Sequence, residues 1–350
     1  STARIEDMTL VHKAQTFPLA AGKTKLKRTD YSFLRRFIDA TKANLFFARG
    51  VMMVEGPAEA ILVPAIAEMC GRSFSKHGVS MVNVGHTGLY HYARILQREG
   101  TGPEIPIPVV CLTDRDIVPD VAKTYVAKPT KGKRFDSDYS ASEMGAAVQR
   151  KKERAEGGKT IVCVSDRWTL EFDLAVHGCA KLMHMAISLA AKAKSRDERL
   201  EEADETATLA EAELSWTSLE GAGHTKEELA AIIYKPLQEK DASKAIAAQY
   251  AAHLVCTGKY GTGEDLFTAL PPYLQAALSH LTIAPAAKPA ATAGAGAAAP
   301  TALTVPGPAT SVPSSTRPPL PAASPTVQST IPTVAAPQGT VVASAQTHGQ

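Results

Sequence analysis

The feature that most constrains the fold of this chain is a series of short apolar segments that alternate with helical patterns. Four segments have the composition of buried strands, at 51–56, 79–85, 107–116 and 159–167. Helical patterns follow the first two of them, at 58–70, where Pro64 is expected to kink the helix, and at 89–99. Strands that alternate with helices form βαβ units, and their parallel sheet is covered by helices on both faces. The sequence therefore predicts an α/β fold.

Helical patterns also surround this central region. Residues 31–48 have a wide apolar helical face, a short helix is possible at 141–155, and segments 169–215 and 225–256 are mostly helical in pattern. The predicted organisation is a helical lead-in at 1–45, a sheet-containing domain at 46–174, a helical domain at 175–281 and a tail at 282–350.

The tail differs from the rest of the chain in composition. Residues 282–350 contain no acid, a single lysine, a single arginine and 12 of the 23 prolines. Such a segment cannot bury enough apolar surface to offset the entropy lost on ordering, so we expect a disordered tether.

The remaining chain is nearly neutral, with 36 basic against 35 acidic residues, and its net charge gives no argument for nucleic acid. Basic clusters at 23–28, 123–134 and 150–154 could follow a phosphate backbone or could be ordinary solvated segments.

Cysteine usage and hydropathy restrict the compartment. The five cysteines show no CxxC pairing, and Cys111 and Cys163 lie inside apolar segments, which argues against a structural zinc site and suits a reducing environment. There is no signal peptide pattern and no apolar run of ~18 residues. We expect a soluble cytoplasmic protein that does not interact with membranes.

Acidic residues stand at the ends of two predicted strands. Glu55 ends the first strand, with Glu59 one helical turn later, and Asp114 and Asp116 end the third strand. If these strands are neighbours, four carboxylates meet at the carboxyl end of the sheet, where α/β proteins bind ligands. Unpaired carboxylates repel one another, so such a site requires a cation. Hard oxygen ligands with room for water favour Mg²⁺ or Mn²⁺ over zinc.

The fourth strand contributes weaker candidates. Ser165 and Asp166 end this strand, and Glu171 interrupts the apolar stretch that follows. Glu171 could be a salt-bridged surface residue or a fifth metal ligand, and Asp173 is the less favoured acid.

At this point the sequence resembles a known module. Residues 46–116 are similar to a Toprim domain, which carries a glutamate after its first strand and a DxD motif after its third, and Glu55, Asp114 and Asp116 match these positions. The stretch 39–68, above all "FFARGVMMVEG" followed by "AE", resembles the OLD (overcoming lysogenization defect) nucleases, whose second acid Glu59 matches. The resemblance extends over about residues 30–281 and includes "VNVGHTGLYHYARIL" and "TLEFDLA".

The resemblance implies a DNA endonuclease that uses two Mg²⁺ or Mn²⁺ ions. The implied ligands are Glu55, Glu59, Asp114, Asp116 and Glu171, with Ser165 completing a coordination shell. These nucleases also carry a late catalytic lysine, for which Lys259 in a Gly-rich turn is the candidate; the alternative is a solvent-exposed lysine at a helix end. An ATPase usually precedes the Toprim domain and mediates dimerisation. Since no Walker motif is present, the chain resembles the C-terminal nuclease half of a longer protein, with phage defence as the family setting.

Two other functions remain open at this stage. A Toprim scaffold could bind metal and DNA without cleaving, as a regulatory module. Strand passage or primer synthesis would need a tyrosine on another domain or a zinc module, and neither pattern is visible. His86 at the end of the second strand could contact a phosphate but fits a loop histidine better, and His91 is expected to pack.

Overall fold

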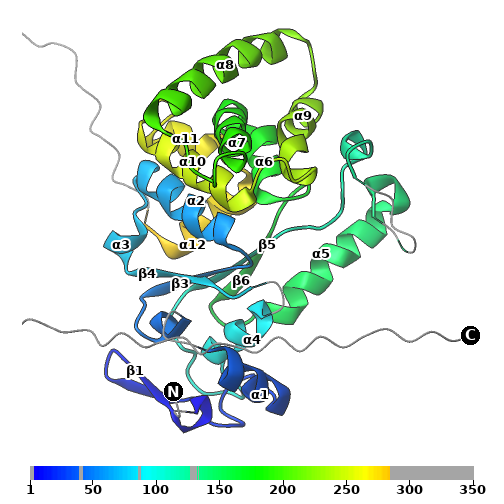
Figure 1. The fold of residues 1–350 in the computed structure, drawn as a ribbon. Coiled ribbons are helices and arrows are strands. Elements are labelled where there is room, and N and C mark those ends of the chain that lie inside the picture. Colours follow the sequence, from blue (N-terminus) through cyan, green and yellow to red (C-terminus); the bar gives the residue numbers. More distant parts are fainter. Residues whose placement is uncertain (1–3, 39–41, 86–87, 127–131, 133, 284–350) are drawn as a thin grey trace, which may run out of the picture. The chain divides into compact units, whose positions relative to one another are not determined.

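A computed structural model describes residues 4–38, 42–85, 88–126, 132 and 134–283, which fall within one compact unit (Figure 1). The predicted tail lies outside the described residues from position 284 onward, and so does His86. The boundaries predicted at residues 45 and 174 stay predictions.

The centre of the fold is a four-stranded parallel sheet, as predicted. Its strand order is β4-β3-β5-β6, with bounds β3 Gly50–Val54, β4 Val79–Asn83, β5 Val109–Thr113 and β6 Thr160–Val164. Strand β3 pairs with β5, so the first and third predicted strands are neighbours. Met53 lies opposite Cys111 in this pairing, and the same register continues to place Glu55 beside Thr113.

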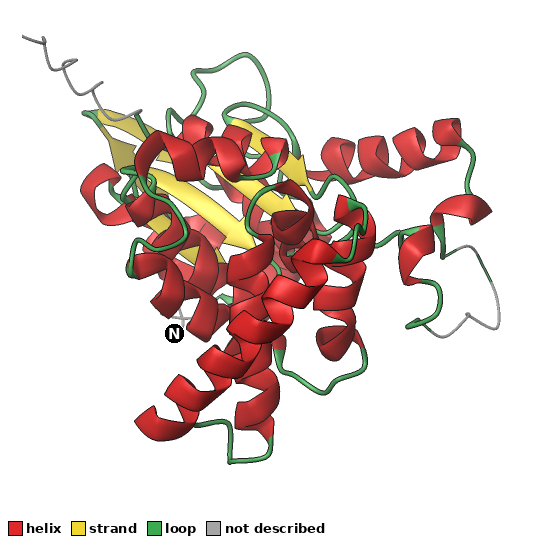
Figure 2. Cartoon of the chain, turned by 90° about the horizontal axis from the view of Figure 1, so that it is seen from above, coloured by secondary structure: helices red, strands yellow, loops and turns green. Residues whose placement is uncertain are grey.

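Helices cover both faces of the sheet (Figure 2). Side chains alternate between two hydrophobic cores, because successive residues of a strand point to opposite faces. Met52 and Val110 belong to one core, whereas Val51 and Val109 belong to the other. This two-sided burial explains why the strands appear in the sequence as continuous apolar runs.

The larger core lies beneath most of the helices. These helices are α2 Pro57–Met69, α3 Phe74–His77, α6 Leu170–His177, α7 Ala180–Lys194, α8 Glu202–Gly221, α9 Lys226–Gln238, α10 Lys244–Cys256, α11 Gly263–Ala269 and α12 Pro272–Leu281. Helix α10 packs against α2 and α7, and α6 packs against α9. Helix α12 returns to contact β3, β5 and β6, so the helical region packs directly on the sheet.

The smaller core lies on the opposite face of the sheet (Figure 1). It is covered by the hairpin β1 Thr9–His12 and β2 Gln15–Pro18 and by the helices α1 Arg28–Phe37 and α4 Leu89–Ala93. Helix α5 Ala141–Ala155 packs on β6 and α4 and contributes Ala155 to this core. Short 3-10 helices lie at η1 Ile5–Asp7, η2 Lys42–Phe46, η3 Arg94–Leu96, η4 Asp120–Ala122 and η5 Asp136–Asp138.

Two predicted helices differ from the structure, and one element of the structure was not predicted. The single helix expected over 31–48 is wrong, because α1 ends at Phe37 and a 3-10 helix follows at 42–46. The helix expected over 89–99 stops at Ala93 and continues as a 3-10 turn. The N-terminal hairpin was not predicted: its turn residues Lys13 and Ala14 both have positive φ, where glycine or asparagine is the usual signal.

None of the five cysteines forms a disulfide. Cys70, Cys111, Cys163 and Cys179 are buried, and Cys256 at the end of α10 is exposed. Among the helices of the described ranges, none is both long enough and apolar enough to cross a membrane.

Gly178 marks a close approach between α6 and the end of α11. A Cβ at Gly178 would lie 2.7 Å from the Cβ and 2.9 Å from the carbonyl oxygen of Ala269. We expect Gly178→Ala to lower the free energy of unfolding by about 1–3 kcal/mol, because the backbone must shift. Gly145→Ala in exposed α5 is the matched control: nothing lies within 4 Å of its added Cβ, and helix propensity predicts a gain of ~0.5–1 kcal/mol. Urea unfolding of both variants measures these changes, and equal stability of the two would contradict the packing.

Candidate metal centre

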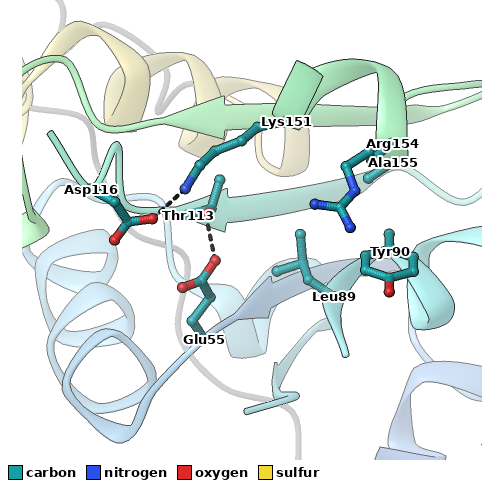
Figure 3. A pocket seen from close by; sticks show the side chains of 8 residues that line it. All are labelled: Glu55, Leu89, Tyr90, Thr113, Asp116, Lys151, Arg154 and Ala155. Carbon is teal, nitrogen blue, oxygen red and sulfur yellow. Dashed lines mark hydrogen bonds and ion pairs between the residues drawn. The ribbon is translucent and has the colours of Figure 1, made fainter. Parts of the chain in front are cut away.

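Two of the predicted acids face a common cavity at the carboxyl end of the sheet. Glu55 follows β3 and receives a hydrogen bond from the hydroxyl of Thr113, the last residue of β5, as the register requires. Glu55 and Asp116 both line a cavity of about 290 Å³, together with Lys151 and Arg154 of α5 (Figure 3). The two strand ends that were predicted to meet therefore do meet.

The other three acids gather around a lysine that the sequence analysis did not select. The Lys244 ammonium, at the start of α10, donates to Glu171 Oε2 at 3.0 Å. Glu171 is almost completely buried, with 4% of its side chain exposed, while Lys244 keeps 40% exposed. Asp114 Oδ1 accepts a hydrogen bond from the backbone N–H of Leu170 at 3.2 Å, which ties the end of β5 to the start of α6.

The carboxylates of this group interact strongly. Burial raises the pKa of Asp114 well above its usual range, the Lys244 charge counters this, and the Glu171 charge adds to it. Burial also raises the pKa of Glu59, again with Glu171 as the largest neighbouring negative charge. For Lys244, burial works to lower the pKa, but the charges of Glu171, Tyr234 and Asp114 and the hydrogen bond to Glu171 together outweigh it, so the pKa is raised. More negative charge is therefore collected here than one lysine neutralises.

Strand alternation explains why the acids form two groups. Val51 and Met53 face the smaller core, and Glu55 continues that alternation, while Val110 and Leu112 face the larger core in line with Asp114. Over the described part of the chain, no three His, Cys, Asp or Glu side chains are arranged to hold a metal ion as they stand. The groups are nevertheless coupled, since the charge of Glu55 raises the pKa of Glu59, and that of Asp116 raises the pKa of Asp114.

Asp116 has an unusual backbone conformation. Its φ is +66°, in the left-handed region that non-glycine residues rarely adopt. The preceding Arg115 anchors the loop: its N–H donates to Ser165 Oγ at 2.7 Å, and its guanidinium donates to the carbonyl of Asp166 at 2.7 Å. The Lys151 ammonium then holds the Asp116 carboxylate at 2.5 Å.

The hydroxyl of Ser165 is engaged in this anchoring. It also donates to the carbonyl of Trp168 at 2.7 Å and is buried. Asp173 has a similar supporting role, because it is fully buried and accepts hydrogen bonds from the backbone N–H groups of residues 166–168. The structure thus places Ser165 in the β6–α6 loop and Asp173 in the first turn of α6, and both residues hold that loop beside the acids.

Lysine positions differ most from the sequence expectation. Lys259 is exposed and follows the C-terminal end of α10, a helix that begins at Lys244 and is ~18 Å long at 1.5 Å per residue. Lys244 and Lys151 contact the acids instead. Lys151 belongs to the basic cluster 150–154 noted in the sequence, whereas Lys244 stands in a stretch with no distinguishing pattern. The packing expected for His91 is confirmed: its ring stacks on Phe33 with centroids 4.2 Å apart.

Residues 46–116 match the family model described as Overcoming lysogenization defect protein-like, TOPRIM domain. These residues form an OLD-like Toprim domain. The match begins just before β3 and ends at Asp116, so it contains Glu55, Glu59, Asp114 and Asp116.

Similar solved structures are C-terminal regions of OLD proteins. The region from Xanthomonas campestris pv. campestris is 24% identical, with 68% of this chain and 94% of that chain covered and a TM-score of 0.37. The region from Burkholderia pseudomallei is 22% identical, with 67% and 97% covered and a TM-score of 0.38. No curated protein matches the chain significantly.

The donor chemistry of the centre fits divalent metal. All five predicted acids offer hard oxygen ligands at one end of the Toprim sheet, and Mg²⁺ and Mn²⁺ favour such ligands. Burial and the neighbouring acids disfavour the ionised forms of Glu59 and Asp114 and raise their pKa values, and a bound cation would favour those ionised forms. Lys151 and Lys244 already contact two of these acids and supply part of the positive charge.

The raised pKa values predict how stability depends on pH in a metal chelator. An acid whose pKa is higher in the folded than in the unfolded protein stabilises the fold below its unfolded pKa, and this contribution is lost as the pH rises through the folded pKa. For Asp173, burial raises the pKa from 3.8 to about 6, and Asp114 is shifted in the same direction. We expect the urea midpoint in EDTA to fall between about pH 4 and pH 7, the interval that spans the unfolded and folded pKa values of Asp173.

Asp114→Asn should make this decline shallower, because the amide cannot ionise. Saturating Mg²⁺ should also reduce it, since bound cations favour the ionised acids. A midpoint that rises with pH in EDTA would contradict the assignment of raised pKa values to these acids.

Proposed function

We propose that this chain is a metal-dependent DNA endonuclease built on the OLD-like Toprim domain. The observation that supports it is the gathering of Glu55, Glu59, Asp114, Asp116 and Glu171 at the carboxyl end of β3 and β5. Toprim membership supports a nuclease-type module, and the OLD resemblance favours DNA as its substrate.

The two groups of acids would hold two divalent ions, Mg²⁺ or Mn²⁺. Glu55 and Asp116 would serve one ion, and Glu59, Glu171 and Asp114 the other, with Asp114 also close enough to Asp116 to interact with its charge. When bound, such ions lower the pKa of water and neutralise the charge of the phosphodiester.

The residues of the chain itself support this chemistry in two ways. Thr113 and Arg115 fix the positions of Glu55 and of the loop that carries Asp114 and Asp116. Lys244 supplies a positive charge next to Asp114 and Glu171, where it would stabilise negative charge that develops on a cleaved phosphodiester. We therefore propose Lys244, in place of Lys259, as the catalytic lysine.

One observation favours a second candidate, a metal- and DNA-binding regulatory module that does not cleave. Lysines already pair with Glu171 and Asp116, and the described acids form no ready set of metal ligands. A plasmid assay separates the candidates: incubation with supercoiled DNA and Mg²⁺ or Mn²⁺ gives nicked and linear products for a nuclease, and only a gel shift for a binding module. Relaxed circles without nicks would instead indicate a topoisomerase.

Asp114→Ala should abolish cleavage. Asp114 interacts with the charges of Lys244, Glu171 and Asp116, and its loss should reduce the cleavage rate by roughly 100-fold or more. The circular dichroism spectrum should be unchanged, because among the described residues the side chain accepts a single backbone hydrogen bond, from Leu170. Cleavage at the wild-type rate by an equally pure variant would overturn the site assignment.

Lys244→Met and Lys259→Met form a matched pair. Loss of Lys244 removes the cation beside Glu171 and Asp114, so we expect single-turnover cleavage to slow by roughly 100-fold. Lys259→Met should leave the rate within about twofold, because an exposed lysine beyond the far end of α10 contributes little. The reverse ranking of the two rates would restore Lys259 as the catalytic lysine.

An N-terminal ATPase that mediates dimerisation stays part of this proposal. The similar solved structures are themselves named as C-terminal regions of OLD proteins. Co-expression with a candidate ATPase region, followed by sizing of the product, tests this partner.

A further inference from the structure

Lys151 makes the contacts that a bound cation would make. Its ammonium donates to Asp116 Oδ2 at 2.5 Å and to the backbone carbonyl oxygen of Asp114 at 2.6 Å. Both oxygens belong to the DxD motif, and the cavity beside them is also lined by Glu55 (Figure 3). A carboxylate oxygen together with a backbone carbonyl is a donor set that suits hard cations as well as ammonium groups.

The contacts of Lys151 lie on both sides of the left-handed turn at Asp116. The left-handed conformation of Asp116 is costly for a residue with a side chain, and Lys151 binds oxygens on both sides of Arg115 at the turn. Asp116 is otherwise open to solvent, with 69% of its side chain exposed, so a dissolved ion can reach the carboxylate that Lys151 holds.

A second basic side chain of helix α5 lies near Lys151 in the same cavity. Arg154 is three residues further along the same helix and lines the same cavity, and its guanidinium lies 4.8 Å from the ring centroid of Tyr90. The two basic side chains therefore belong to one face of α5, as residues three apart on a helix do. Together they offer positive charge to an anion that enters the cavity beside the acids.

We propose that Lys151 is a positioning residue that holds Asp116 in place of a divalent cation. When the cation binds, the ammonium is displaced, and Lys151 and Arg154 then bind a phosphate of the DNA strand. This inference rests on the proposed nuclease function and extends it. Binding of the metal ion would itself release Lys151 to bind a phosphate.

The neighbouring Lys152 provides a matched control. It lies on the same helix but lines a different cavity beside β6, with Val162 and Cys163. The variants are Lys151→Met, Lys151→Gln and Lys152→Met, and thermal unfolding in EDTA first establishes that each is folded. Lys151→Gln keeps a hydrogen-bond donor without the charge, so a merely structural role would be rescued by it.

Mn²⁺ binding is measured by the electron paramagnetic resonance signal of free Mn²⁺, with no DNA present. Removing a competing internal cation should tighten the binding of Mn²⁺ by about threefold or more in both Lys151 variants. Lys152→Met should match the wild type. Unchanged or weaker Mn²⁺ binding in both Lys151 variants would overturn the inference.

Binding of a fluorescein-labelled DNA duplex in Ca²⁺, followed by fluorescence anisotropy, tests the second half. Lys151→Met and Arg154→Met should each weaken the binding and reduce the salt dependence by about one phosphate contact. If Lys151→Met binds DNA no more weakly than Lys152→Met, the displaced Lys151 does not bind a phosphate, and the proposed phosphate contact is wrong.

Failure of this inference can be told from failure of the nuclease proposal. If the wild type binds Mn²⁺ and cleaves plasmid DNA while the Lys151 variants bind Mn²⁺ no more tightly, only the inference fails. If neither the wild type nor Lys151→Met binds Mn²⁺, both fail together.

Discussion

The parallel pairing of β3 with β5 is the contact on which the rest of the site depends. It brings the ends of two strands to one edge of the sheet and places Glu55 against Thr113, a residue 58 positions later in the sequence. Because both faces of this sheet are buried in separate cores, the strands cannot slip by one residue without reversing every inward side chain. The positions of the acids are therefore fixed by the same packing that stabilises the fold.

The acids at this edge repel one another, and lysines of the same chain reduce this repulsion. Lys244 neutralises part of the group around Glu171, and Lys151 holds Asp116 on the other side. The surrounding loops are tied down by backbone hydrogen bonds to Asp173 and Ser165, so the carboxylates cannot simply move apart. A rigid acidic edge with lysines beside it suits the cation and phosphate binding that we propose.

Much of the fold and of the acid set could be predicted from the sequence, for a physical reason. A buried parallel strand leaves a continuous apolar run, and an acid at its end is conspicuous, so Glu55, Asp114 and Asp116 could be selected from local pattern alone. Helix α5 was also predictable, since Ser140 and Glu143 form a capping box at its start. The β1–β2 hairpin was not, because its Lys13–Ala14 turn lacks the residues that usually favour positive φ.

The lysines show where local pattern is insufficient. Lys244 reaches Glu171 across 73 positions of sequence, through the packing of α10 on α2 and α7. A lysine at the start of a helix is common, and only tertiary structure distinguishes this one from Lys259. The division of the acids between the two faces likewise follows from strand alternation combined with the left-handed turn at Asp116, which no composition or motif records.

The distribution of the thiols has a practical consequence for studying this centre. Burial raises the pKa of Cys70, Cys163 and Cys179 to about 12 and that of Cys111 further still, so these thiols are poor nucleophiles at neutral pH. Cys256 alone among the five is exposed, at the opposite end of α10 from Lys244. A maleimide probe would therefore label the native chain at a single position, on the helix that carries the lysine of the acidic centre, without any engineered cysteine.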